Sequence, residues 1–100
     1  MIHLTGELDH HFAKQVKDEI DREIIKENTT RLIFDFTALT FMDSSGIGTL
    51  LGRYKLMQSL GGGIAICGAS PQVDKLLAMS GVKNIIKTYD SLKAVKNEEK

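Results

Sequence analysis

The residues best suited to chemistry lie in one short polar stretch, from Phe41 to Gly48. It follows a predicted strand and leads into a predicted helix, where α/β folds usually present functional groups. Ser44 or Ser45 can cap that helix by accepting a hydrogen bond from a backbone N–H group two or three residues on. Gly46 and Gly48 let another backbone or an enzyme approach closely. The stretch is therefore either a functional loop or only a helix cap with packing glycines.

A second polar turn, which contains Gly6, runs from Leu4 to Asp9 near the N-terminus. Asp9 could cap the helix that follows. Glu7 and Asp9 could also offer carboxylates to an arginine on a partner. The turn is equally compatible with a simple connection between a strand and a helix.

Three common motifs of nucleotide binding and hydrolysis do not occur in the sequence, although its histidines leave a Ser-His-Asp hydrolase compatible with its composition. The dinucleotide motif, the P-loop and the nucleophile elbow are all missing. The spacing typical of metal ligands is missing from the three histidines (His3, His10 and His11) and the single cysteine, Cys67. We therefore expect no metal and no cofactor. Because Cys67 lies in an apolar run, we expect a buried, unreactive thiol.

Two other kinds of protein remain as alternatives. One is a small nucleotide-binding or enzymatic α/β domain that uses the loop with Gly46 and Gly48. The other is a phospho-accepting receiver domain that uses Asp35 or Asp43. The receiver is disfavoured because such domains are usually longer and carry an acidic pair after their first strand.

The apolar pattern predicts strands and helices in alternation. Strands are expected at residues 1–5, 32–36, 64–67 and 84–87. Helices are expected from residue 12, from about residue 47, from the Ser70-Pro71 start signal, and after Asp90 as a cap. Glycines 61–63 and Gly81 should end the second and third helices. Short apolar strands joined by helical crossovers predict a single α/β domain, with a small, mostly parallel sheet flanked by about four helices.

Length and charge limit the possible functions. The chain has 100 residues, enough for one domain. Lys and Arg together number 13, as do Asp and Glu, which argues against a dedicated nucleic-acid binder. No apolar run reaches the roughly 20 residues of a membrane span and no signal peptide begins the chain, so a cytoplasmic protein is expected. Residues 96–100 should form a solvated charged tail on a domain that spans 1–100.

Three blocks of the sequence together resemble a known family. They are Leu4-Thr5-Gly6-Glu7-Leu8-Asp9-His10-His11, Phe41-Met42-Asp43-Ser44-Ser45-Gly46-Ile47-Gly48 and Leu51-Gly52-Arg53-Tyr54-Lys55. In this order they are similar to the STAS-domain anti-sigma factor antagonists (anti-anti-sigma factors), especially the sporulation members. The resemblance covers about residues 2–88. Only three residues precede the first block, where the family normally has a further strand, so that strand is expected to be shortened or missing.

The resemblance implies a regulator that performs no catalysis. Such proteins bind an anti-sigma factor that is also a serine kinase, and thereby free the sigma factor. The kinase phosphorylates the serine directly after the aspartate, here Ser44, and a serine phosphatase reverses this step. The partner-binding positions implied for this chain are Gly6, Glu7, Asp9, Asp43, Ser44, Ser45, Gly46 and Gly48.

Overall fold

A computed structural model describes the chain at residues 2–9, 11–27 and 30–98. Its α-helices are α1 (Ala13–Glu27), α2 (Ser44–Ser59), α3 (Pro71–Met79) and α4 (Leu92–Glu98), with a short 3-10 helix η1 (Val82–Asn84). Its strands are β1 (Ile2–His3), β2 (Gly6–Leu8), β3 (Arg31–Asp35), β4 (Leu39–Met42), β5 (Gly63–Cys67) and β6 (Lys87–Tyr89).

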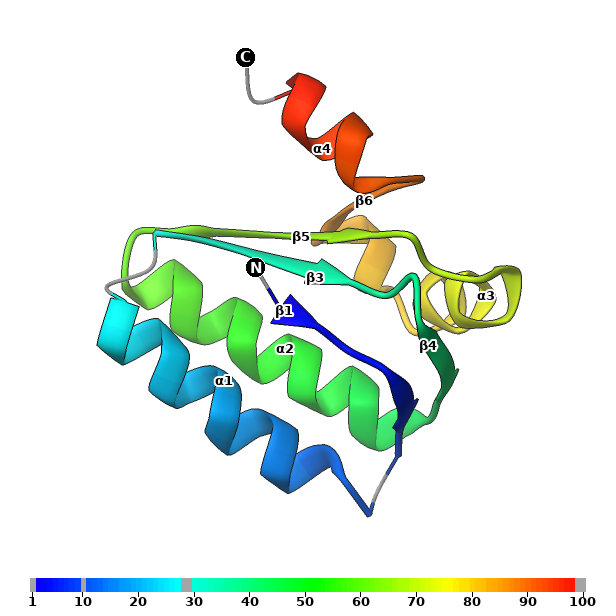
Figure 1. The fold of residues 1–100 in the computed structure, drawn as a ribbon, viewed down its shortest axis with the longest axis horizontal. Coiled ribbons are helices and arrows are strands. Elements are labelled where there is room, and N and C mark those ends of the chain that lie inside the picture. The colour runs from blue at the N-terminus through cyan, green and yellow to red at the C-terminus, as the bar shows by residue number, and fades with distance from the viewer. Residues whose placement is uncertain (1, 10, 28–29, 99–100) are drawn as a thin grey trace.

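All strand pairs are parallel, as the short apolar strands predicted. The main sheet has the order β1-β3-β5-β6, and β2 and β4 form a separate two-stranded sheet. Helices α1 and α2 lie side by side on one side of the main sheet, while α4 lies on the other side and contacts β5 and β6 (Figure 1). The predicted α/β class and the four flanking helices are therefore confirmed.

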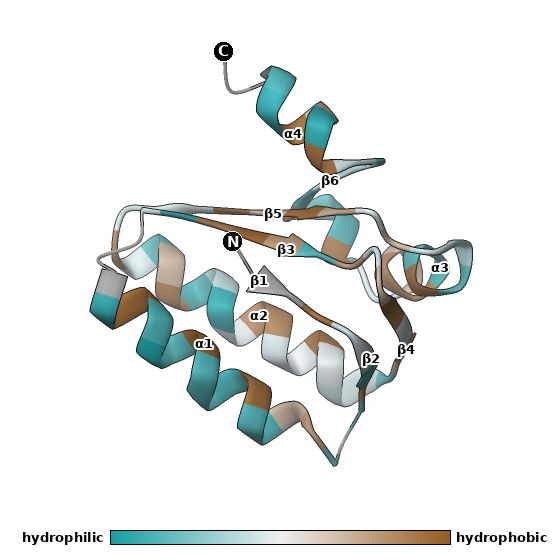
Figure 2. Cartoon of the chain, viewed as in Figure 1, coloured by the Kyte–Doolittle hydropathy of each residue, from teal (hydrophilic) through white to brown (hydrophobic). Residues whose placement is uncertain are grey.

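The core lies between the main sheet and the α1–α2 pair. Phe34 of β3 and Ile66 of β5 are fully buried, as are Leu50 and Met57 of α2. Burying each such side chain stabilises the fold by roughly 1.5–3 kcal/mol. The central strands are accordingly hydrophobic, while α1 and α4 carry most of the hydrophilic colour (Figure 2).

The helix boundaries mostly follow the predicted signals. Ser70 caps α3, where its Oγ accepts a hydrogen bond from Val73 N at 3.2 Å. Gly61 and Gly81 adopt positive φ angles just after α2 and α3, which glycine does at little cost. The cap of α4 was predicted wrongly. Ser91, not Asp90, accepts the hydrogen bond of Ala94 N, at 3.2 Å.

The strand predictions missed one sheet and misplaced one strand. Residues 4–9 were expected to form a polar turn, and no strand was predicted at residues 39–42. Strands β2 and β4 are short and lack regular alternation of polar and apolar residues. The last strand begins at Lys87 instead of residue 84. Residues 82–84 form a 3-10 turn instead, and Ile86 N donates to Val82 O at 2.8 Å. Before the Leu4 block, β1 consists of two residues paired with β3.

Candidate functional site

The first turn of α2 presents Ser44 to solvent. Asp43 is the N-cap, and its Oδ1 accepts hydrogen bonds from Ser45 N at 2.9 Å and Gly46 N at 3.4 Å. The expectation that Ser44 or Ser45 caps the helix was therefore wrong, because the aspartate before them makes those bonds. Ser44 is the first helical residue and is exposed, while Ser45 is partly buried.

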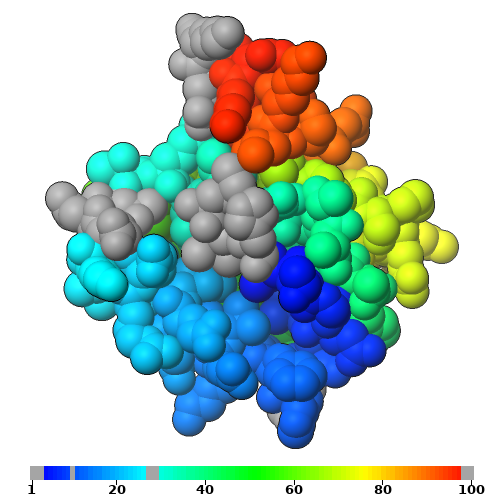
Figure 3. Space-filling model, viewed as in Figure 1, coloured from blue at the N-terminus to red at the C-terminus, as the bar shows by residue number. Residues whose placement is uncertain are grey.

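The small β2–β4 sheet brings the two polar blocks of the sequence together. Glu7 pairs with Phe41, and Leu8 pairs with Met42. Where the two strands end, Asp43 N donates a hydrogen bond to Leu8 O at 3.4 Å. Figure 3 shows the blue N-terminal segment lying against the blue-green segment near residue 40. Asp9 follows Leu8 and Ser44 follows Asp43, so this hydrogen bond joins the chain segments that carry the two polar residues.

Asp9 was predicted to cap the first helix, and it caps the turn that leads into α1, with its backbone oxygen accepting a hydrogen bond from Ala13 N at 2.9 Å. Its Oδ1 accepts hydrogen bonds from His11 N at 3.0 Å and Phe12 N at 3.2 Å. The N-termini of α1 and α2 point toward the same end of the molecule (Figure 1). The two aspartates therefore hold neighbouring helix starts beside the β2–β4 sheet.

The glycines of the two blocks have different surroundings. Gly46 is buried, and a β-carbon there would come within 2.8 Å of Leu8 O. It contributes close packing of α2 against β2 and cannot contact a partner or a phosphate directly. Gly48 is exposed with open space around it, and Gly6 is exposed with φ +75°. The burial of Gly46 argues against the alternative of a nucleotide-binding loop at Gly46 and Gly48, because Gly46 is covered by Leu8 and Met42.

Exposed aromatic and acidic side chains surround this end of the molecule. Phe12 is 44% exposed and Phe41 is 40% exposed, unusual for large apolar side chains. Glu7 is exposed and Asp9 and Asp43 are partly so. A groove of about 440 Å³ between the N-terminal segment and α1 is lined by Leu4, Thr5, Gly6, Glu7, Phe12, Gln15, Val16 and Glu19. Phe41 belongs to the polar stretch singled out in the sequence, but the exposure of the two phenylalanines was not predicted.

The other residues considered for chemistry lie apart from this surface. Cys67 is fully buried, as expected, and burial together with the negative charge of Asp35 raises the pKa of its thiol. His11 is exposed and packs edge-on against Phe12, whereas His10 and the His3 side chain are outside what the structure describes. Within residues 2–9, 11–27 and 30–98, no group of His, Cys, Asp or Glu side chains could hold a metal ion. No helix in these same ranges is long and apolar enough to span a membrane.

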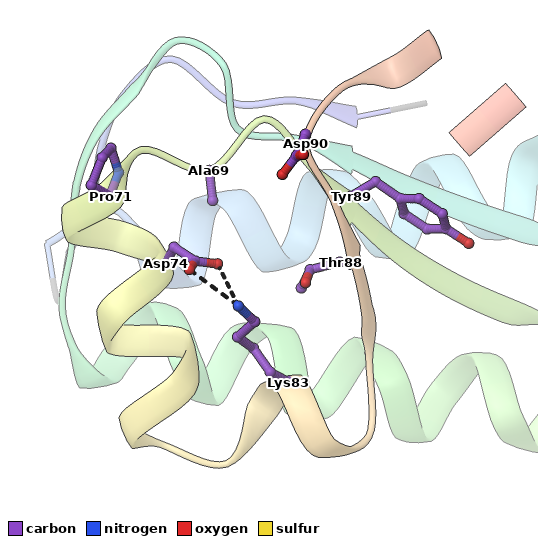
Figure 4. Close-up of a pocket in the computed structure, with 7 residues that line it drawn as sticks. All are labelled: Ala69, Pro71, Asp74, Lys83, Thr88, Tyr89 and Asp90. Carbon is purple, nitrogen blue, oxygen red and sulfur yellow. Dashed lines mark hydrogen bonds and ion pairs between the residues drawn. The ribbon is translucent and has the colours of Figure 1, made fainter. Parts of the chain in front are cut away.

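A further hollow of about 340 Å³ lies beside α3 and β6 (Figure 4). Its lining residues are Ala69, Pro71, Asp74, Lys83, Thr88, Tyr89 and Asp90. Lys83 Nζ lies 3.0 and 3.1 Å from the two carboxylate oxygens of Asp74. Because these two opposite charges satisfy each other across the hollow, we place no functional site there.

Comparison with known proteins identifies the family. The family model of the STAS domain matches residues 1–95, and the chain belongs to the STAS domain family. It is 42% identical to an anti-sigma F factor antagonist from Paenibacillus polymyxa, over 91% of this chain and 78% of that protein. Within the family, the chain therefore groups with the anti-sigma factor antagonists of the SpoIIAA type.

Two solved structures of SpoIIAA share this fold. The unphosphorylated form of that anti-sigma factor antagonist matches with a TM-score of 0.73 and 30% identity, over 97% of this chain and 84% of the other. The phosphorylated form of SpoIIAA, described as a Bacillus cell fate determinant, matches with a TM-score of 0.70 and 33% identity, over 95% and 86%. The predicted family is thereby confirmed.

Proposed function

We propose that this chain antagonises an anti-sigma factor by binding it through the surface around Ser44, and that phosphorylation of Ser44 by a serine kinase ends the binding. The observation that carries the proposal is the exposed position of Ser44 in the first turn of α2, directly after the capping residue Asp43. The similarity to a protein known in phosphorylated and unphosphorylated forms supports a covalent switch.

The proposed binding surface combines apolar area with negative charge. Phe12 and Phe41 would supply the apolar contacts, since exposed aromatic side chains are enriched in protein interfaces. Glu7 and Asp9 would pair with basic side chains of the anti-sigma factor. The full set of proposed positions is Gly6, Glu7, Asp9, Asp43, Ser44, Ser45, Gly46 and Gly48. Among these, buried Gly46 would act by keeping α2 close to β2.

Phosphorylation should change binding and leave folding intact. A phosphate on Ser44 adds about −1.5 to −2 charges at the N-terminus of α2, where the helix dipole favours negative charge by about 0.3–1 kcal/mol. At the interface the same group would have to lose its water. It would also add to the charge of Asp43. We propose that a serine phosphatase removes the phosphate and restores binding.

The test is phosphorylation by a purified anti-sigma factor serine kinase with ATP, followed by mass mapping of the peptide around Ser44. We expect one phosphate on the wild-type chain, one on Ser45→Ala and none on Ser44→Ala. Ser45 makes a matched control because it is the same residue type one position further into α2. Labelling of Ser45 with Ser44 unmodified would show that the assigned site is wrong.

A further inference from the structure

A groove between α1 and α2 has features that partner binding around Ser44 does not explain. It has a volume of about 280 Å³ and is lined by Ala13, Lys14, Lys17, Ser45, Gly48, Thr49, Gly52 and Arg53. Three of these side chains are cationic and none is acidic. The groove therefore concentrates positive charge on a chain whose net formal charge is zero.

Arg53 is the most unusual of these residues. Its side chain is only 7% exposed, and its Nε lies 2.9 Å from Asp21 Oδ1 in an ion pair that lacks hydrogen-bond geometry. Its Nη1 is buried and, among the described residues, has no hydrogen-bond partner. A buried guanidinium N–H without an acceptor is costly, and an acceptor entering the groove would remove that cost.

The positive charge of the groove is only partly neutralised. Asp21 is shared between two cations, since its Oδ2 also lies 3.2 Å from Lys17 Nζ. Lys17 Nζ has a weaker contact with Asp18, at 3.9 Å. Lys14 forms no ion pair with any residue that the structure describes. The three cations of the groove therefore face two carboxylates, and the charge of Lys14 is left for a ligand.

Two glycines of α2 line the groove, although close packing does not require glycine at either position. Gly48 and Gly52 lie one turn apart within α2, and a β-carbon at either position would meet nothing within 4 Å. Glycine within a helix is less stable than alanine, so both positions carry a cost that neighbouring atoms do not explain. Their effect is to keep the space in front of Arg53 open.

We propose that this groove is a binding site for a tetrahedral oxyanion, a phosphate group held by Arg53, Lys14 and Lys17. Guanidinium groups bind phosphate through paired N–H donors, and lysines add point charges. The N-terminus of α2 contributes little, because Asp43 already accepts hydrogen bonds from two N–H groups of its first turn. The site is independent of whether Ser44 is phosphorylated.

The test is a titration of the ¹⁵N-labelled chain with inorganic phosphate at constant ionic strength, balanced with sodium chloride. We expect saturable shifts of the Arg53 Nε–H signal and of the Gly48 and Gly52 amides. Phenyl phosphate in a parallel titration distinguishes a phosphate ester from free phosphate as the preferred form. Acetate should bind more weakly than either, because it offers fewer acceptor oxygens.

Two variants test the groove, and one matched variant controls for charge. Gly52→Val fills the floor and Lys14→Gln removes one cation, so each should weaken phosphate binding roughly tenfold or more. Lys55→Gln makes the same charge change on an exposed position of α2 outside the groove and should bind like wild type. If Gly52→Val disturbs the fold, Gly52→Ala provides a smaller obstruction. Equal shifts with chloride and phosphate would overturn the proposal. So would wild-type phosphate affinity in Lys14→Gln together with wild-type affinity in the folded Gly52 variant.

Discussion

Gly46 lies so close to Leu8 that a β-carbon added to Gly46 would be 2.8 Å from the Leu8 carbonyl oxygen and 2.5 Å from Met42 Cγ. This contact holds the start of α2 against the β2–β4 sheet. We predict that Gly46→Ala lowers the free energy of unfolding by about 1–3 kcal/mol, because the backbone carbonyl cannot move aside cheaply. Urea denaturation followed by circular dichroism would measure the loss.

Gly48 is the matched control for that substitution. It lies on the same helix, but a β-carbon there meets no atom within 4 Å. Gly48→Ala should therefore raise the free energy of unfolding, by about 0.5–1 kcal/mol. Equal effects of the two substitutions would contradict the close contact between α2 and β2.

Asp43 should stabilise α2 through its cap. We predict that Asp43→Ala lowers the free energy of unfolding by about 1 kcal/mol, because Ser45 N loses its acceptor, whereas Gly46 N keeps the backbone oxygen of residue 43 at 3.0 Å. Asp43→Asn retains an acceptor oxygen at the cap and should cost much less. Urea titrations of both variants would check the order. A larger loss for Asp43→Asn than for Asp43→Ala would be incompatible with this cap.

Local patterns in the sequence were sufficient to predict the helices, the parallel main sheet and the cap at Asp9. These features depend on residues close in sequence, such as the apolar spacing of α1 or the Ser70-Pro71 start of α3. The same local patterns placed Ser44 and Ser45 at a helix start. The choice of Asp43 over Ser44 as the cap depends on which residue first adopts helical backbone angles, a difference of one position that sequence patterns do not resolve.

The β2–β4 sheet and the α1–α2 groove could not be predicted in this way. Strands of three and four residues carry too little periodicity to be recognised, and their pairing joins distant parts of the chain. Arg53 would be expected on the surface by its residue type. It is buried because Asp21 on α1 lies beside it, a relationship that only the packing of two helices creates.

The buried thiol of Cys67 should make stability depend on alkaline pH. Its pKa is raised above the usual 9.0 by burial and, secondarily, by Asp35, so the folded chain keeps the thiol protonated where the unfolded chain loses the proton. Stability is therefore unaffected below about pH 9 and falls as the pH rises above it. Urea titrations between pH 8 and about 10 should show a steeper loss for wild type than for Cys67→Ala. Identical slopes would show that the thiol ionises equally in both states.

Substitutions at Ser44 should separate binding from folding. Ser44→Ala should bind the anti-sigma factor like the unphosphorylated chain and stay bound in the presence of kinase activity. Ser44→Asp should bind more weakly, and full phosphorylation should weaken binding about a hundredfold, equivalent to roughly 3 kcal/mol. Isothermal titration calorimetry would measure these affinities.

Folding controls accompany the Ser44 experiment. Ser44→Asp should melt at the same temperature as wild type or higher, because the new charge lies at the N-terminus of α2. Ser59→Asp adds the same charge at the other end of α2 and should leave binding unchanged. Weak binding by Ser59→Asp as well would indicate a general charge effect and contradict a local switch.

The Asp21–Arg53 pair provides a separate test of the groove. Removing the partner of a buried charge usually costs 3–5 kcal/mol, and since Asp21 is a quarter exposed we expect about 2 kcal/mol for Asp21→Asn. Asp18→Asn changes an exposed acid on the same helix and should alter stability by less than about 0.5 kcal/mol. If the groove binds phosphate, added phosphate should raise the melting temperature of Asp21→Asn more than that of wild type, since the variant leaves Arg53 and Lys17 without their shared carboxylate. An equal rise in both proteins would mean that phosphate does not contact this pair.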